Sequence, residues 1–315
     1  MISLTKIFKA LADDIRLRIM RILINGPFHV NEILAITGLK QSNISHHLKI
    51  LQESEMVNKK REGTLIYYTI NETFFNKELK ALFHILKERN ESIPYQAEDK
   101  KRQVLVSEKR KLQAEKFFNS VGENFNNIQD NLFERIYSVK EALAFIKQKA
   151  AIAVDIGCGT GRNLVHLAKK AEKIIGIDSS HKMLQLSDHI CQKHNLNYEL
   201  KQGDIHKIPQ ADKSIQIALL NMVLHHSMTP VLLLKDVNRI LNIGNHLILI
   251  DLLEHKDENM REKYADFWLG FSDTEIIDWL KQTGFRIEHF EKKGINNKLP
   301  VFILVARKIK QLSEN

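Results

Sequence analysis

Three aspartates follow apolar segments in the second half of the chain. Asp155 ends IAVD, Asp178 ends KIIGID and Asp204 follows YELKQG. The stretch after Asp155 holds glycines at alternate positions, Gly157, Gly159 and Gly161. Glycines permit a sharp turn and close approach of the backbone to a ligand. Carboxylates so placed can accept hydrogen bonds from ribose hydroxyls or an adenine amino group. The pattern therefore predicts a nucleoside site.

A nicotinamide dinucleotide fits this pattern as far as Asp178, but two details argue against it. The dinucleotide fingerprint G-x-G-x-x-G requires glycine where this chain has Arg162. The carboxylate of Asp155 faces the loop, where it would repel a pyrophosphate and attract a cationic amine or sulfonium. The sequence therefore favours a nucleoside ligand that carries a cationic amine or sulfonium over a dinucleotide.

Catalytic candidates follow the next two apolar segments, in NMVLHHSMTP and DLLEHKDENMREKYADFWLGF. We take His225 as the first candidate base; a histidine bonded to a loop carbonyl is the alternative. Methyl transfer depends mainly on in-line positioning and sometimes on a base. The sequence identifies no acceptor. Arsenite methylation is disfavoured, because soft thiolate ligands would be needed and the chain has two cysteines.

The elements that must position these residues are short apolar runs alternating with helical patterns. This alternation predicts βαβ units, an α/β fold with a parallel sheet. Asp155, Asp178 and Asp204 would then share the sheet edge where such folds bind ligands. The expected strands cover 151–156, 174–178, 198–202, 215–223, 246–253, 285–290 and 301–306.

The N-terminal region has a different pattern. Ile33, Leu34 and Ile36 suit a short helix, Gly38 a tight turn, and a second helix begins near Gln41. The outward face of that second helix is polar or basic, as needed to contact phosphates and base edges in a major groove. The DNA-contacting residues predicted there are Lys40, Gln41, Ser42, Ser45, His46 and Lys49.

A basic hairpin follows this second helix. Lys59, Lys60 and Arg61 precede a turn at Gly63, and alternating apolar residues come after it. Residues 1–90 also carry five of the nine excess positive charges. Helix-turn-helix, basic hairpin and charge together favour DNA binding. A protein–protein winged helix is the alternative.

Residues 3–90 resemble the ArsR family of winged-helix repressors, through FKALADDIRLRIMRIL, SNISHHLKIL and the basic hairpin. The resemblance implies a homodimer that pairs through the first helix and the helix near 76–90 and reads a palindromic operator in double-stranded DNA. Metal sensing of the kind found in this family is not expected, because FHVNEILAIT lacks cysteine. We expect no metal site.

Residues 118–309 resemble class I S-adenosylmethionine-dependent methyltransferases, through DIGCGTG, DSSHKML and QGDI. The resemblance implies that Asp155 and the loop glycines hold the methionine moiety, and that Asp178 holds the ribose. Met183 would pack on adenine, and Asp204 with the Ile205 amide would read its edge. Ser179 and Asn221 complete the implied cofactor-binding set. The last two strands match the antiparallel C-terminal hairpin of that family.

Together, the two halves resemble fused ArsR–methyltransferase regulators, some of which respond to S-adenosylhomocysteine. We expect an N-terminal winged helix-turn-helix domain (1–90), a charged helical connector (91–118) and a Rossmann-like class I methyltransferase domain (119–315). Three functions remain open: a repressor that senses an S-adenosyl ligand, an active small-molecule methyltransferase, or an enzyme that modifies DNA or protein. The last lacks the N/D-P-P-Y/F stretch of base-flipping methyltransferases, with Asn221-Met222-Val223-Leu224 in its place.

Composition sets the remaining limits. No run of about 18 apolar residues occurs, so no membrane span is expected. Charges interrupt the N-terminal residues, unlike a signal peptide. Two cysteines do not make a disulfide framework. These features favour the cytoplasm.

Overall fold

The computed structural model describes residues 3–71, 77–133, 136–294 and 299–312. The chain divides into two compact units, Met1–Leu112 and Gln113–Asn315, and each is described by itself. Among the described residues, none of the helices combines the length and apolar character needed to cross a membrane.

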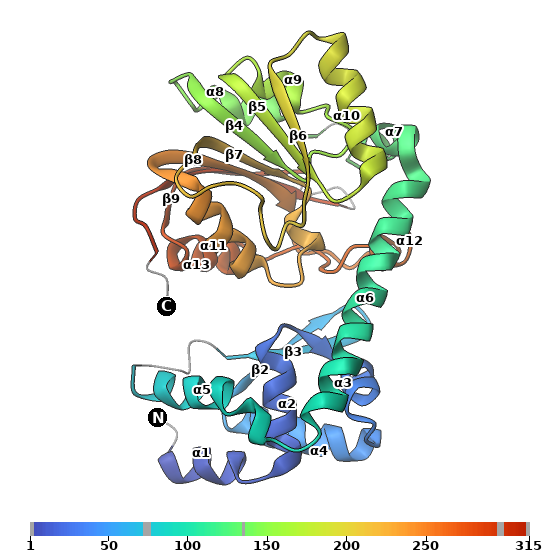
Figure 1. Cartoon of the computed structure of the whole chain (residues 1–315), viewed down its shortest axis with the longest axis vertical. Coiled ribbons are helices and arrows are strands. Elements are labelled where there is room, and N and C mark those ends of the chain that lie inside the picture. The colour runs from blue at the N-terminus through green and yellow to red at the C-terminus, as the bar shows by residue number, and fades with distance from the viewer. Residues whose placement is uncertain (1–2, 72–76, 134–135, 295–298, 313–315) are drawn as a thin grey trace. The chain divides into compact units, whose positions relative to one another are not determined.

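The first unit is a winged helix-turn-helix (Figure 1). Its strands form an antiparallel sheet in the order β1-β3-β2. Gly38 adopts φ +72 between α3 and α4, which supplies the predicted tight turn. The elements are α1 (Leu4–Leu11), α2 (Asp14–Ile24), β1 (Phe28–His29), α3 (Val30–Thr37), α4 (Gln41–Glu53), β2 (Val57–Glu62), β3 (Leu65–Ile70) and α5 (Lys77–Glu88). Residue 76 of the predicted dimer helix lies outside the described residues.

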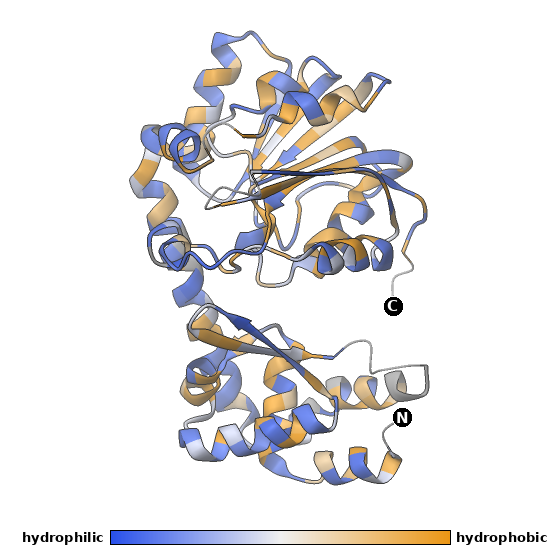
Figure 2. Cartoon of the chain, turned by 180° about the vertical axis from the view of Figure 1, so that it is seen from behind, coloured by the Kyte–Doolittle hydropathy of each residue, from blue (hydrophilic) through white to orange (hydrophobic). Residues whose placement is uncertain are grey.

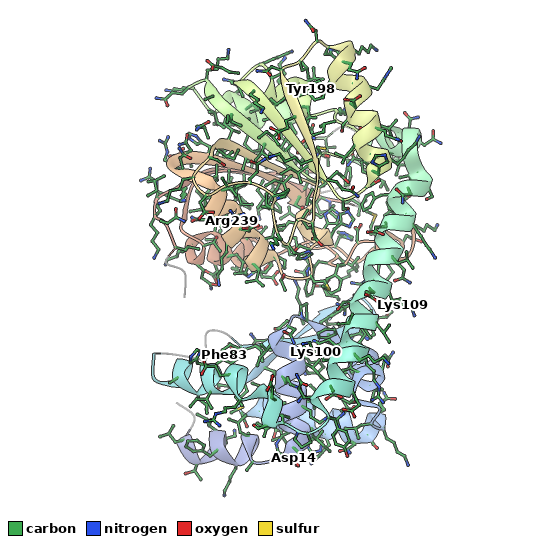
Figure 3. All side chains as sticks on the ribbon, in the orientation of Figure 1. Asp14, Phe83, Lys100, Lys109, Tyr198 and Arg239 are labelled. Atoms are coloured by element: carbon green, nitrogen blue, oxygen red, sulfur yellow. The ribbon has the colours of Figure 1, made fainter. Side chains whose placement is uncertain are left out.

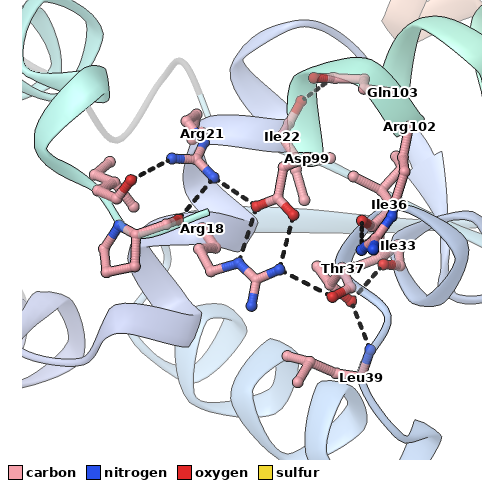
Figure 4. Close-up of polar contacts among 12 residues, drawn as sticks. Arg18, Arg21, Ile22, Ile33, Ile36, Thr37, Leu39, Asp99, Arg102 and Gln103 are labelled. Carbon is pink, nitrogen blue, oxygen red and sulfur yellow. Dashed lines mark hydrogen bonds and ion pairs between the residues drawn. The ribbon is translucent and has the colours of Figure 1, made fainter. Parts of the chain in front are cut away.

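The long helix α6 (Gln96–Val121) is anchored in the first unit by a buried carboxylate. Asp99 is 1% exposed and accepts hydrogen bonds from Arg18 Nε and Nη2 at 2.9 and 2.7 Å and from Arg21 Nη2 at 2.5 Å (Figure 4). On the solvent side of α6, Lys100 and Lys109 are exposed (Figure 3). Two buried cations held by one carboxylate fix the start of α6 against α2.

The second unit contains a seven-stranded sheet in the order β6-β5-β4-β7-β8-β10-β9. Neighbouring strands from β6 to β8 pair in parallel, whereas β10 runs antiparallel to both β8 and β9. All seven predicted strands are present, and the predicted antiparallel C-terminal hairpin is confirmed. Their bounds are β4 (Ala150–Ile156), β5 (Ala171–Asp178), β6 (Tyr198–Gln202), β7 (Ile215–Asn221), β8 (Leu241–Leu252), β9 (Phe285–Lys293) and β10 (Val301–Lys308).

Helices cover both faces of this sheet (Figure 1). On one face α8, α9 and α10 pack over Ala153, Ile217 and Ile248. On the other face α11 and α13 pack together against β8 and β9. The central strands are coloured mostly as hydrophobic (Figure 2), as expected for parallel strands that are buried on both faces. The helices are α7 (Phe125–Phe133), α8 (Val139–Ala144), α9 (Leu164–Leu167), α10 (His181–Lys193), α11 (Pro230–Ile240), α12 (Asn259–Tyr264) and α13 (Asp273–Gln282).

Candidate ligand-binding site and nucleic-acid interface

The glycine loop lies where the strand order reverses, because β4 has β5 on one side and β7 on the other. Gly157, Gly159 and Gly161 have φ values of +75, +53 and +82. A Cβ atom on Gly157 would lie 2.5 Å from Val223 Cγ2, and one on Gly161 would lie 2.8 Å from Ser187 Cα. The loop therefore requires glycine both for its backbone conformation and for close packing against neighbouring elements.

Asp178 holds the loop in place from the end of β5. Its Oδ2 accepts the N–H of Gly159 at 2.9 Å, and its Oδ1 accepts the N–H of Ser180 at 2.8 Å. Burial raises the pKa of Asp178, and these backbone donors oppose that rise. The carboxylate thus orders both the glycine loop and the start of α10.

Asp155 is fully buried at the end of β4, and neither of its carboxylate oxygens has a hydrogen-bond partner within the described ranges. Burial, together with the charge of Asp178, raises the pKa of Asp155 to about 8. An unpaired buried carboxylate is costly unless a proton or a cation satisfies it. The position suits a ligand that carries a positive amine.

Asn221 lies beside this carboxylate in the sheet. Ile156 pairs with Leu220 in the β4–β7 register, so Asn221 follows at the level of Gly157. Its Oδ1 is also buried and lacks a hydrogen-bond partner in the described part of the chain. Three buried oxygens without partners among the described residues, two from Asp155 and one from Asn221, therefore lie at adjacent strand ends beside the glycine loop and can accept hydrogen bonds from a bound molecule.

The other predicted cofactor residues lie at the outer strands. Ser179 is exposed, and Met183 is 1% exposed in the first turn of α10. Asp204 comes two residues after β6 ends, and its Oδ1 accepts the N–H of His206 at 2.9 Å. Ile205 lies next to it, partly buried. Asp155, Asp178 and Asn221 thus end three adjacent strands, whereas Asp204 bonds within its own loop.

Residues 119–130 also pack on the glycine loop, which the sequence interpretation did not include. Asn119 Oδ1 accepts the hydroxyl of Ser180 at 2.9 Å, and Asn126 Oδ1 accepts the hydroxyl of Thr160 at 2.8 Å. The ring of Phe125 lies 3.5 Å from where a Cβ of Gly159 would stand. The polar run FNNIQD could have indicated this contact from the sequence, because polar side chains near a predicted loop can form hydrogen bonds with it. The end of α6 and the start of α7 therefore form part of this site.

His225 lies in a short 3-10 turn (Leu224–His226, η3) between two buried aspartates. Its Nδ1 is 2.6 Å from Asp251 Oδ1, and its Nε2 is 3.5 Å from Asp266 Oδ1. Asp251 Oδ2 also accepts the N–H groups of Val223 and Leu224, at 3.1 and 2.8 Å. The histidine and its aspartates thus tie the loop after β7 to the end of β8 and to residue 266.

The charges in this cluster oppose a role for His225 as a base. Burial disfavours its protonated form, but Asp251 and Asp266 outweigh this effect and raise the pKa of His225 to about 10. Burial and the neighbouring His225 lower the pKa of His226 to about 4. A histidine that is already protonated at neutral pH cannot accept a proton from a methyl acceptor.

The exposed face of α4 matches the predicted DNA-reading surface. Ile44, Leu48 and Leu51 are fully buried. The six residues predicted to contact DNA are all exposed to solvent: Lys40, Gln41, Ser42, Ser45, His46 and Lys49. His47, on the same helix, is 7% exposed and has Nδ1 3.5 Å from Asp13 Oδ1. His47 therefore belongs to the packing between α2 and α4.

The basic hairpin presents its three cations unequally. Lys59 and Arg61 on β2 are exposed. Lys60 lies on the opposite side of the strand, with Nζ 3.0 Å from Glu62 Oε1. The alternation of strand side chains accounts for this difference. Lys59 and Arg61 are consequently the cations that a phosphate backbone can reach most directly.

Comparison with known proteins supports both units. Residues 13–59 match the model of the bacterial regulatory protein arsR family, and residues 147–285 match a methyltransferase domain. The arsenical resistance operon repressor of Bacillus subtilis (strain 168) is 41% identical over 70 residues, which cover 22% of this chain and 67% of the repressor. Coverage of other relatives is as low as 29% of their length.

The second unit resembles methyltransferases in both sequence and fold. A demethylmenaquinone methyltransferase of Staphylococcus carnosus (strain TM300) is 24% identical over 185 residues, covering 54% of this chain and 76% of that protein. A chain from the complex of the Haloferax volcanii Trm112 methyltransferase activator with a methyltransferase superposes with a TM-score of 0.53 and 16% identity. This match covers 62% of the present chain and 99% of the solved one, and it shows the fold alone.

Proposed function

Since the chain belongs to the ArsR family of bacterial regulatory proteins and carries a methyltransferase domain after its helix-turn-helix, we propose that it is a transcription repressor with an S-adenosyl effector. The effector is S-adenosylhomocysteine or S-adenosylmethionine, bound at the glycine loop. The buried carboxylate of Asp155, which has no partner among the described residues, carries this proposal, because the ammonium group of an S-adenosyl ligand would supply the positive donor that it lacks.

The effector would use the strand ends of the second unit. Asp155, Gly157, Gly159, Gly161 and Asn221 would hold the methionine moiety, whose ammonium pairs with Asp155. Asp178 and Ser179 would hold the ribose, Met183 would pack on adenine, and Asp204 with Ile205 would read the adenine edge. S-adenosylmethionine supplies a transferable methyl group on a sulfonium when it binds. These residues bind and orient the ligand, and none of them has to accept a proton from a methyl acceptor.

Sensing accounts for the site better than acid–base catalysis does. His225, the candidate base, has its ring nitrogens 2.6 and 3.5 Å from two buried aspartates. An active S-adenosylmethionine-dependent small-molecule methyltransferase is the second candidate. It is favoured by the similarity to demethylmenaquinone methyltransferases, and methyl transfer to an acceptor that is already deprotonated needs positioning alone.

Double-stranded operator DNA is the proposed partner of the first unit. The exposed side chains of α4 would read base edges in the major groove, and Lys59, Lys60 and Arg61 would contact phosphates. A homodimer would present two such helices to a palindromic site. The two helices that would pair carry exposed apolar residues, namely Leu4 and Phe8 on α1 and Ile85 on α5. Burial of these side chains between two chains supports this assembly. A DNA-bound regulator acts in the cytoplasm.

The proposed domains are 1–90 for DNA binding, 91–118 as connector and 119–315 for the effector. The boundary between the two compact units falls after Leu112, inside α6 and inside the proposed connector. A connector that is continuous with both units can couple ligand affinity to DNA affinity.

Operator binding with and without ligand tests the proposal. The full chain first selects duplexes from a random pool, and the affinity for the selected duplex is then measured with no ligand, with S-adenosylhomocysteine and with S-adenosylmethionine. A tenfold change in operator affinity corresponds to a coupling free energy of about 1.4 kcal/mol, and operator DNA must then change the affinity for the ligand by the same factor. The two ligands should differ, since only one carries a sulfonium. Asp155→Ala should abolish the response and leave ligand-free DNA binding intact.

Equal operator affinity in all three conditions would refute sensing and leave the methyltransferase candidate. Failure to bind either ligand would refute the assignment of the second unit as well.

A further inference from the structure

The cluster around His225 contains metal-ligating atoms that the proposed function does not use. Ligand atoms of His225, His226 and Asp266 all lie within 4.8 Å of one another. His225 and Asp266 are buried, and the side chain of His226 is 18% exposed. All three come from two loops at the same edge of the sheet, after β7 and after α12.

The orientation of His225 is the one that metal-binding histidines adopt. Its Nδ1 donates to Asp251 Oδ1 at 2.6 Å, which leaves the Nε2 lone pair directed toward Asp266 when the ring is neutral. Metal-bound histidines usually donate their other ring N–H to a carboxylate in this way. Asp251 is fully buried and also accepts the N–H of Leu252 at 2.8 Å, so it is itself held firmly.

Asp266 supplies the second, independent observation. Its side chain is 1% exposed, Oδ1 lies 3.5 Å from His225 Nε2, and Oδ2 is buried with no hydrogen-bond partner in the part of the chain that the structure describes. The 3.5 Å separation is close to the roughly 3.4 Å expected between two ligands of a tetrahedral zinc ion. The widest pair of ligand atoms, which lie within 4.8 Å of one another, would have to approach by up to about 1.4 Å to reach that spacing.

We propose that His225, His226 and Asp266 bind a divalent cation of the zinc type. Two imidazoles and one carboxylate suit Zn²⁺, and Co²⁺ is its spectroscopic substitute, whereas Mg²⁺ prefers oxygen ligands. Three protein ligands leave a fourth position for water or another donor. Asp251 is a positioning residue that orients His225.

The sequence led us to expect no metal because FHVNEILAIT lacks cysteine. Asp266 stands 40 residues from His226 in the chain, so only the folded loops bring the three ligands together. None of the three ligand residues belongs to the proposed effector-binding set.

Zn²⁺ titration of the full chain tests the proposal without DNA or an S-adenosyl ligand. Protein stripped with a chelator is titrated in competition with a chromophoric chelator, and Co²⁺ absorption reports tetrahedral coordination. We expect one ion per chain. Asp266→Asn and His226→Gln should each weaken binding at least tenfold, with far-ultraviolet circular dichroism unchanged; Asp251→Asn should weaken it about 10- to 100-fold.

His206→Gln is the matched control, because His206 Nδ1 lies 2.9 Å from Asp204 Oδ1 and neither residue belongs to the cluster of His225, His226 and Asp266. It should bind Zn²⁺ as the wild type does. Equal affinity in the wild type and in either His226→Gln or Asp266→Asn would overturn the metal site, as would the absence of binding by the wild type. A chain that binds Zn²⁺ but ignores both S-adenosyl ligands would retain the metal site and refute the effector proposal.

Discussion

Replacing Asp99 with asparagine should destabilise the first unit by about 3–5 kcal/mol. The carboxylate is 1% exposed and receives three hydrogen bonds from two guanidinium groups, which are themselves buried. Asparagine has the same size but no charge. Arg18 and Arg21 would then remain buried beside each other without a counterion, and the cost of an uncompensated buried charge exceeds that of a lost surface pair.

The chain offers a direct way to assign the change to one unit. Its only two tryptophans, Trp268 and Trp279, both belong to the second unit. Urea unfolding followed by circular dichroism reports both units, while tryptophan fluorescence reports the second. In Asp99→Asn, the circular dichroism transition should begin at lower urea and the fluorescence midpoint should stay in place.

Glu98→Gln is the control, because Glu98 precedes Asp99 on the same helix and is exposed. It removes one negative charge from α6 without uncovering a buried cation, and surface substitutions of this kind change stability by about 0.5 kcal/mol or less. A circular dichroism shift in Asp99→Asn no larger than that in Glu98→Gln would contradict the stabilising role of the Asp99 carboxylate. An equally large shift of the tryptophan transition would contradict the assignment of the effect to the first unit.

Three further predictions concern the proposed ligand and DNA sites. Gly157→Ala should abolish S-adenosyl binding in calorimetry, because its Cβ would lie 2.5 Å from Val223 Cγ2. Gly244→Ala controls for backbone strain, because Gly244 has φ +83 and no atom within 4 Å of an added Cβ. Equal ligand affinity in both variants would contradict the predicted clash at Gly157. The pKa of Asp155 near 8 lies above its unfolded value, so below pH 8 it holds a proton that a cationic ligand must displace. The affinity for an S-adenosyl ligand should thus rise by up to about tenfold per pH unit between pH 6 and 8. A similar rise in the Asp155→Asn variant would exclude the Asp155 carboxyl as its cause. Changing Lys59 and Arg61 together to alanine should flatten the salt dependence of DNA binding by about two units of slope; an unchanged slope would remove the hairpin from the interface.

Features that depend on neighbours along the chain were readable from the sequence. The seven strands follow from apolar runs, because side chains buried on both faces of a parallel sheet must be apolar. The loop of Gly157, Gly159 and Gly161 follows from the need for left-handed backbone at alternate positions. The polar face of α4 follows from helical spacing, which separates its exposed side chains from the buried Ile44 and Leu48.

Tertiary structure decided the features that join distant residues. Asp99 accepts a hydrogen bond from Arg18, which lies 81 residues earlier in the chain. His225 contacts Asp251 and Asp266, which lie on other segments, and no periodicity along the chain indicates these contacts. Helical spacing could not tell that His47 turns inward toward Asp13. A buried charge requires a specific partner in three dimensions, whereas hydrophobic burial requires only a pattern along the chain. The strands and the glycine loop could therefore be predicted from the sequence, while the ionic contacts that hold α6 and the loop after β7 in place required the folded chain.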